Sequence, residues 1–188
     1  DAKNDSKMFM AMGNIGKTLD FMRGSCNVNG SFSRNESHLF SQSQAVNSVS
    51  TGWSVGGKIS GSPCRWFSFD YRIDYSDSRL SMNGLSESWL STMENELGLT
   101  FIPHRKWQWT VSGEHYRNEL TENSYKNIVL LDTRLTYQLN KKIEFAASLT
   151  NILDRRSYNY TTYSELSSFE SQRQLRGRQL LFSITLRK

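Results

Sequence analysis

The chain has 188 residues, a formal net charge of +5, 37% hydrophobic residues and a mean hydropathy of −0.59. It contains no apolar run of about eighteen residues, which excludes a membrane-spanning helix but not a membrane β-barrel, whose strands need only alternate in polarity. Lysine and arginine are spread along the chain without a basic stripe, so nucleic acid is not an expected partner. Cys26 and Cys64 have the spacing of neither a zinc site nor a disulfide scaffold.

Apolar and polar side chains alternate along most of the chain, and this pattern places successive residues on opposite faces of a β-strand. The segment WFSFDYRIDYS is the clearest example, because its apolar residues occupy the odd positions 67 to 75 and its polar residues the even ones. The alternation predicts an all-β chain of about nine strands. The predicted strands cover residues 6–19, 24–37, 46–61, 65–82, 88–103, 106–121, 126–139, 142–153 and 172–187.

The connections between these strands alternate in length. Those at 20–23, 62–64, 104–105 and 140–141 are short, and those at 38–45, 83–87, 122–125 and 154–171 are longer or strongly polar. Outer-membrane barrels have short turns at one end and long external loops at the other, and their strands are longer than the usual five or six residues of globular sheets. The sequence therefore predicts an antiparallel up-and-down transmembrane β-barrel segment whose apolar face contacts outer-membrane lipid.

The two faces of such strands have different surroundings. The polar face is predicted to line a water-filled lumen, and the tryptophans beside the short turns, Trp66, Trp107 and Trp109, are predicted to form an interfacial girdle. A soluble β-sandwich with an aromatic core is the alternative. The charged residues predicted to face the lumen are Asp70, Arg72, Asp74, Asp132 and Arg134.

The number of strands leaves two architectures open. Nine is odd, whereas bacterial single-chain barrels have an even number of antiparallel strands. One possibility is a small, self-closed barrel of eight or ten strands with a structural or adhesive role, and the other is the last arc of a larger barrel. Pairing between 6–19 and 172–187 would indicate the closed barrel, and two free edges would indicate the arc.

Catalytic and cofactor-binding motifs are absent from the sequence: it has no Gly-rich phosphate loop, GxSxG elbow or HExxH motif. Glu114 and His115 are neighbours in a predicted strand and point to opposite faces, so they cannot act on one substrate. We therefore expect no enzyme, no metal site and no cofactor. The enzyme alternative is an outer-membrane barrel hydrolase, whose scattered candidate carboxylates are Asp77, Glu119 and Asp154.

The end of the chain resembles the C-terminal end of TonB-dependent outer-membrane receptors. In that family the penultimate strand closes on a motif of the type Asn-Leu-Phe-Asp-Lys-x-Tyr, and an Arg-rich segment leads to the final strand. The first motif stands here as Asn151, Ile152, Leu153, Asp154, Arg155, Arg156 and Tyr158, and the second as Arg176, Gly177 and Arg178. Upstream strand patterns also resemble barrels of Bacteroidetes-type outer-membrane proteins. The family usually ends on an aromatic residue, whereas this chain ends on Lys188.

The resemblance implies a function that the residues alone do not. It implies the last arc of a transporter barrel of about twenty-two strands in the bacterial cell outer membrane. The partners that it implies are a plug domain and the remaining barrel strands of the full-length protein, a TonB-type energy transducer and the barrel-assembly machinery. The cargo would be a scarce nutrient: an iron chelate, cobalamin, a glycan or a peptide. Asn151 and Asp154 would cap a strand that leaves the membrane, and an external loop would carry Tyr158, Tyr160 and Tyr163.

Overall fold

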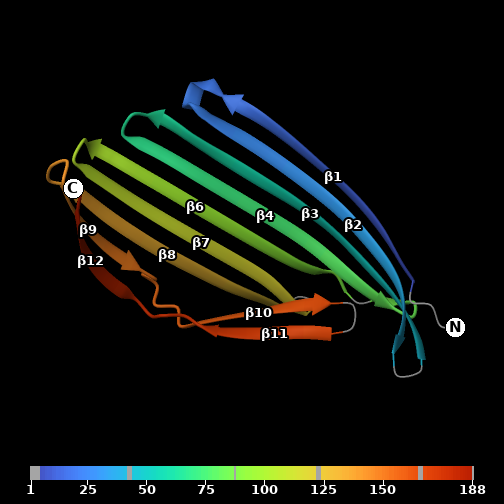
Figure 1. The fold of residues 1–188 in the computed structure, drawn as a ribbon. Helices are drawn as coiled ribbons and strands as arrows, with labels where there is room; N and C mark the ends of the chain where they lie inside the picture. The colour runs from blue at the N-terminus through green and yellow to red at the C-terminus, as the bar shows by residue number, and fades with distance from the viewer. Residues whose placement is uncertain (1–4, 42–43, 87, 122–123, 165–166, 188) are drawn as a thin grey trace.

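A computed structural model of the chain describes residues 5–41, 44–86, 88–121, 124–164 and 167–187. None of its helical residues forms a segment long and apolar enough to cross a membrane. Nine long strands form one antiparallel up-and-down sheet, in which each strand pairs with its neighbours in chain order (Figure 1). They are β1 (Asp5–Leu19), β2 (Gly24–Ser41), β3 (Gln44–Cys64), β4 (Phe67–Met82), β6 (Leu90–His104), β7 (Trp107–Thr121), β8 (Ser124–Gln138), β9 (Ile143–Thr150) and β12 (Gln179–Leu186).

Three shorter elements complete the described structure. A single 3-10 turn, η1 (Asp20–Met22), joins β1 to β2, and β5 (Leu85–Ser86) pairs only with the end of β4. β10 (Ser157–Ser164) and β11 (Ser167–Gln174) form a separate two-stranded hairpin, and β10 contacts β7.

The register confirms that the sequence alternation builds a sheet with two different faces. On one face Phe67 lies opposite Phe101, which lies opposite Trp109, which in turn lies opposite Leu135. Phe67, Trp109 and Leu135 are each followed by a serine or threonine that points the other way. The prediction of an all-β antiparallel fold is therefore confirmed, and the nine long strands agree with the number expected.

Four predicted boundaries are wrong. In the connections expected at 38–45 and 122–125 the described residues are strand, because β2 extends to Ser41, β3 begins at Gln44 and β8 begins at Ser124. The strand expected over 172–187 is two strands, since β11 ends at Gln174 and β12 begins at Gln179. The loop expected over 154–171 contains β10. Apart from the break between β11 and β12, strand pairing continues in these segments through residues that lack an apolar alternation.

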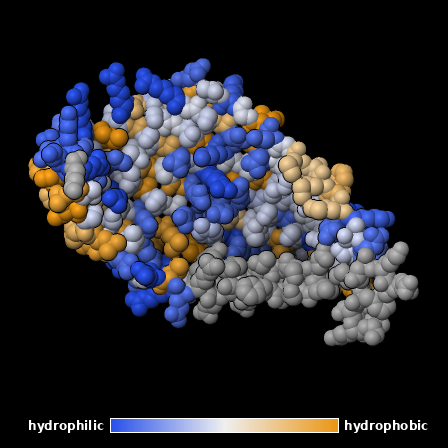
Figure 2. Space-filling view, viewed as in Figure 1, coloured by the Kyte–Doolittle hydropathy of each residue, from blue (hydrophilic) through white to orange (hydrophobic). Residues whose placement is uncertain are grey.

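The sheet has almost no interior. Among the described apolar side chains only Ile128 and Ala146 are buried, whereas Trp109, Leu135 and Phe182 are 46%, 43% and 76% exposed. A soluble domain of this length buries an apolar face against a second layer. No second sheet or helix covers Phe67, Phe69, Tyr71 or Ile73 in the described structure, which contradicts the β-sandwich alternative. Hydrophilic side chains spread over the middle of the view in Figure 2, and apolar side chains lie mainly at its margins.

The apolar face forms a band that runs obliquely across the hydrogen-bonded rows. In β12 the apolar run covers residues 180–186, and Phe182 shares its row with Phe67 of β4. In β1 the run covers residues 9–15, and Ile15 shares its row with Ile73 of β4. The middle of the band thus shifts by about ten residues over about eight strand steps, which at ~3.3 Å per residue and ~4.8 Å per strand corresponds to a strand tilt of about 40°.

The sheet is open. Within the described residues β1 pairs only with β2, and β12 pairs only with β9. Because nine strands alternate in direction, these two edge strands run the same way (Figure 1). The pairing expected for a small self-closed barrel, between the first and last long strands, is not formed.

Candidate functional site: the polar face and its junction

The five residues predicted to share one face do share it. Asp70, Arg72 and Asp74 follow each other at alternate positions of β4. Asp70 is linked through Gly98 and Ser112 to Asp132 of β8, and Arg134 follows on the same face two residues later. The structure thus places three of the residues on one strand and two on another, three strand steps away.

Arg72 lies at the centre of the charges on β4. Its Nε donates to Asp74 Oδ2 at 2.5 Å, and its register partners are Lys58 on one side and Glu96 on the other. Its side chain is 53% exposed, so this ion pair contributes little to stability. The charged side chains of the polar face are instead available to interact with solvent or with a molecule that lies on this face.

Further acids on this face were missed by the sequence analysis. Glu94 lies opposite Asp74, and Glu96 lies opposite Glu114 of β7. Glu114 accepts a hydrogen bond from the Tyr116 hydroxyl at 3.2 Å. Glu94, Glu96 and Glu114 occupy even positions, as Asp70 does, and this shared numbering could have predicted that they lie on the same face.

Two glycines allow the acids of β4 to lie flat on the sheet. The Asp70 carboxylate occupies the space that a Cβ at Gly98 would take. A Cβ at Gly56 would lie 2.5 Å from Asp74 Oδ1 and 2.7 Å from Asn29 Oδ1. These glycines therefore position polar side chains rather than form turns.

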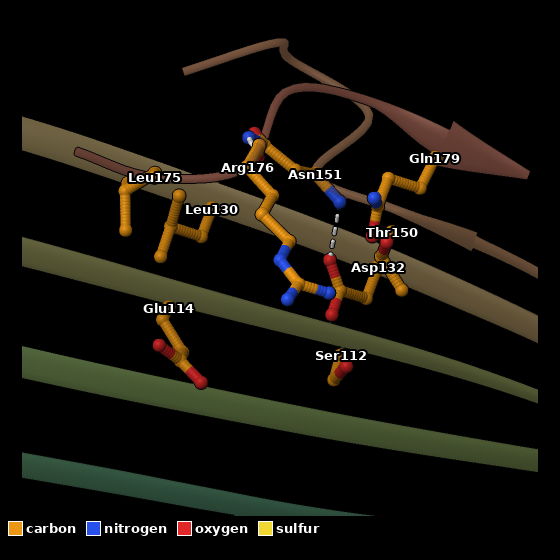
Figure 3. A pocket seen from close by; sticks show the side chains of 9 residues that line it. All are labelled: Ser112, Glu114, Leu130, Asp132, Thr150, Asn151, Leu175, Arg176 and Gln179. Carbon is orange, nitrogen blue, oxygen red and sulfur yellow. Dashed lines mark hydrogen bonds between the residues drawn. The ribbon is translucent and has the colours of Figure 1, made fainter. Parts of the chain in front are cut away.

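A pocket of about 220 Å³ lies on the polar face where the segment after β11 crosses β8 (Figure 3). Arg176 reaches from that segment toward Asp132, whose Oδ1 accepts a hydrogen bond from the Asn151 backbone N–H at 2.7 Å. Leu175 and Leu130 form its apolar side. The complete lining is Ser112, Glu114, Leu130, Asp132, Thr150, Asn151, Leu175, Arg176 and Gln179.

Asn151 joins three segments at the end of β9. Its Nδ2 donates to the carbonyls of Arg155 and Arg176 at 2.7 and 2.8 Å, and its Oδ1 accepts from the Arg155 N–H at 2.9 Å. The residue is 8% exposed and has φ = 51°, a left-handed conformation that asparagine tolerates better than most residues. Asn151 therefore ends β9 and also ties down the base of the β10–β11 hairpin.

Asp154 makes a second set of bonds in the same junction. Its Oδ1 accepts from the Arg178 N–H at 2.9 Å, and its Oδ2 pairs with Arg156 at 3.1 Å. The hydrogen bond from Arg178 and the neighbouring Arg156 lower the pKa of the Asp154 carboxyl. A Cβ at Gly177 would lie 2.7 Å from Asp154 Oδ1, so a larger residue here would displace the carboxylate. We refer to residues 151–156 and 176–178 as the junction.

The three tyrosines expected in an external loop belong to a strand. Tyr158, Tyr160 and Tyr163 lie in β10, which pairs with β11 in an antiparallel register. Their backbone is therefore strand and not irregular, and their place in an external loop stays a prediction. Their side chains lie outside the described part of the structure.

The carboxylates and histidines considered for a hydrolase do not converge. His115 lies on the apolar face between Asn95 and Asn127, at 3.2 and 3.3 Å, whereas Glu114 lies on the polar face. Glu119 accepts from the backbone N–H and the hydroxyl of Ser91. Asp77 lies near Glu119, and Asp154 lies in the junction. The described residues contain no group of three or more His, Cys, Asp or Glu side chains placed to hold a metal ion.

Comparison of the chain with protein-family models, with curated proteins and with solved structures finds no match.

Proposed function

We propose that this chain forms the last arc of the wall of a TonB-dependent outer-membrane transporter for a scarce nutrient. The observation that carries the proposal is a single-layered sheet with an uncovered apolar face opposite a charged one. In a bilayer the apolar face contacts acyl chains, and the charged face lines a water-filled lumen. Among the described long strands, all but β1 and β12 pair with a neighbour on both sides, so the two edges are where further strands would pair.

The oblique course of the apolar band supports a barrel. A band that stays level in a membrane must shift in register from strand to strand when the strands are tilted. The shift found here corresponds to a tilt of about 40°, within the range of transmembrane barrels. A flat sheet that buried one face against another layer would have no need for this shift.

The open edges support an arc rather than a small complete barrel. In the proposed transporter, β1 and β12 pair with the remaining strands of the full-length protein, and the barrel-assembly machinery inserts the closed barrel. Asp70, Arg72, Asp74, Asp132 and Arg134 face the lumen, where a plug domain and the passing solute would meet them. A TonB-type transducer would act on that plug, and the solute class would be an iron chelate, cobalamin, a glycan or a peptide.

The junction supports the family resemblance on which the transport function rests. Residues that carry the resemblance bond to each other although about twenty-five positions separate the two motifs: Asn151 donates to the Arg176 carbonyl, and Asp154 accepts from the Arg178 N–H. A chance similarity of composition would not be expected to bring both motifs into one hydrogen-bonded unit.

Cysteine accessibility in membranes from cells that express the protein tests the proposal. Val111 and Ser112 are adjacent in β7 and face opposite sides, so they form a matched pair in a background with Cys26→Ser and Cys64→Ser. In Ser112→Cys the thiol faces water and should react rapidly with a charged maleimide, whereas in Val111→Cys it faces lipid and should react far more slowly. Equal reaction rates at the two positions would contradict the proposed placement.

A further inference from the structure

The apolar face carries a furrow over β8 and β9. One groove of about 490 Å³ is lined by Pro103, Trp107, Trp109, Thr133, Leu135, Ala147, Leu149 and Leu180. A second groove of about 410 Å³ shares Trp107, Leu135 and Ala147 with the first and continues past Tyr137, Phe145, Phe182 and Ile184. The two together form one furrow that runs along β9 toward the short turn between β8 and β9.

Small and large side chains give the furrow its shape. Ala147 forms the floor, because it lies in one register row between Leu135 and Phe182. Trp107 and Trp109 form one wall, and Trp107 packs against Tyr137 with ring centroids 4.5 Å apart. Aromatic rings thus form one wall of the furrow, and the small side chain of Ala147 leaves its floor low.

Most of the furrow lining is apolar, and the hydroxyl that lines the first groove is already hydrogen-bonded. The Thr133 hydroxyl, the polar group of the first groove, accepts from Trp109 Nε1 at 2.7 Å and donates to the Thr110 carbonyl at 3.1 Å. Both polar atoms are therefore occupied. A ligand that fits this part must be a narrow apolar chain.

The short-turn end of the furrow is positively charged. Arg105 and Lys106 form the turn that precedes Trp107, and Lys141 and Lys142 form the turn between β8 and β9. All four are exposed, and no carboxylate in the described structure forms an ion pair with them, whereas Arg187 nearby is paired with Glu144 at 2.8 Å. An apolar furrow that opens on unpaired cations matches a ligand with an acyl chain and an anionic head group.

We propose that this furrow and the adjoining cations bind one anionic glycerophospholipid, with an acyl chain over Ala147 and the phosphate at Arg105, Lys106, Lys141 and Lys142. This inference rests on the proposed membrane location of the sheet. It adds a specific lipid site to one part of a surface that otherwise contacts lipid without selection. The lipid belongs to the leaflet at the short-turn side.

Fluorescence quenching by brominated lipids tests the site in the purified protein, reconstituted in phosphatidylcholine vesicles. The emission of Trp109 is the part of the wild-type signal that disappears in Trp109→Phe. The emission of Trp66 is the part that disappears in Trp66→Phe, and quenching of the two is compared. Trp66 lies at another short turn, outside the furrow, and is the control for depth. Brominated phosphatidylglycerol should quench the Trp109 component more strongly than brominated phosphatidylcholine at equal mole fraction, and should quench Trp66 with no such preference.

Variants at the turns and in the furrow distinguish the contribution of the charges from that of the apolar groove. Lys141→Gln with Lys142→Gln should weaken the preference for phosphatidylglycerol roughly fivefold per lysine, whereas Arg23→Gln with Arg65→Gln, the same charge change at distant turns, should leave it intact. Ala147→Phe should fill the floor and reduce quenching of Trp109 by both lipids.

The possible failures can be told apart. Equal quenching of Trp109 by both lipids, unchanged by either variant, would overturn the lipid site while leaving the membrane placement in force. Absence of quenching at both Trp66 and Trp109 by any lipid would overturn the membrane placement and the site together.

Discussion

At the scale of single residues, the end of the sheet depends on asparagine and aspartate at left-handed positions. Asn151 and Asp154 have φ values of 51° and 50°, and each bonds to backbone that is distant in sequence. The sequence motif predicted that these two residues end a strand. It could not predict their partners, because the carbonyl of Arg176 and the N–H of Arg178 carry no sequence signal.

Asn151→Ala should destabilise the junction by about 2–4 kcal/mol, since three hydrogen bonds are lost and alanine is less tolerant of positive φ. Unfolding in urea and hydrogen exchange at residues 175–178 would measure the loss. Asn83→Ala is the matched control, because Asn83 also has a positive φ of 49° but accepts a single bond, from the Asn47 N–H. Equal effects of the two changes would show that Asn151 does not join the three segments.

Acid should loosen the same junction. Because the pKa of the Asp154 carboxyl is lowered in the folded protein, its stabilising contribution is present above the ordinary carboxyl pKa and is lost as pH falls through the lowered value. The protection factor of the Arg178 amide, which is its exchange rate in the unfolded chain divided by its rate in the folded protein at the same pH, should therefore be lower below about pH 4 than at neutral pH. In Asp154→Asn the protection factor should be lower at neutral pH and nearly independent of this titration. A wild-type protection factor that acid leaves unchanged would contradict the role of the carboxylate.

At the scale of elements, alternation predicted the strands that carry an apolar face and missed those that do not. The bounds of β4 and β7 were predicted to within two residues, because apolar residues on one face of each strand alternate with polar or charged residues on the other. The β10–β11 hairpin was missed because its sequences, SYNYTTYS and SSFESQRQ, are polar at most positions. β11 and β12 are separated at residues 175–178 because Arg176 and Arg178 bond to Asn151 and Asp154. The local sequence does not reveal these contacts.

The turn between β1 and β2 gives a test at this scale. A Cβ at Gly24 would collide with the backbone of Ser60 and Gly61 in β3, whereas a Cβ at Gly13 has open space within 4 Å. Gly24→Ala should therefore destabilise the sheet by about 1–3 kcal/mol, because backbone cannot move aside as a side chain can. Gly13→Ala should be neutral or slightly stabilising. The midpoint of urea unfolding in detergent micelles would show the difference, and equal midpoints would contradict the close approach of the turn to β3.

At the scale of the whole molecule, the sheet has a single layer and two unpaired edges. The number of long strands could be predicted from periodicity, since most of them alternate in polarity. The oblique band could not, because it depends on the register of all nine strands and appears only when the rows are aligned.

Disulfide trapping distinguishes an open sheet from a closed one. In a background without Cys26 and Cys64, Ala147→Cys with Phe182→Cys should form a disulfide, because these residues face each other in β9 and β12. Ala11→Cys or Gly13→Cys, each with Phe182→Cys, should form none within one chain. Efficient cross-linking between β1 and β12 would show that the nine strands close on themselves.

The shared direction of β1 and β12 has a consequence for any larger wall that includes this sheet. If every contact in that wall is antiparallel, the strand laid against β12 and the strand laid against β1 must both run opposite to them. A segment that starts and finishes in one direction contains an odd number of strands. The number of remaining strands in such a wall is therefore odd. The total number of strands in the closed wall is then even, whatever its size.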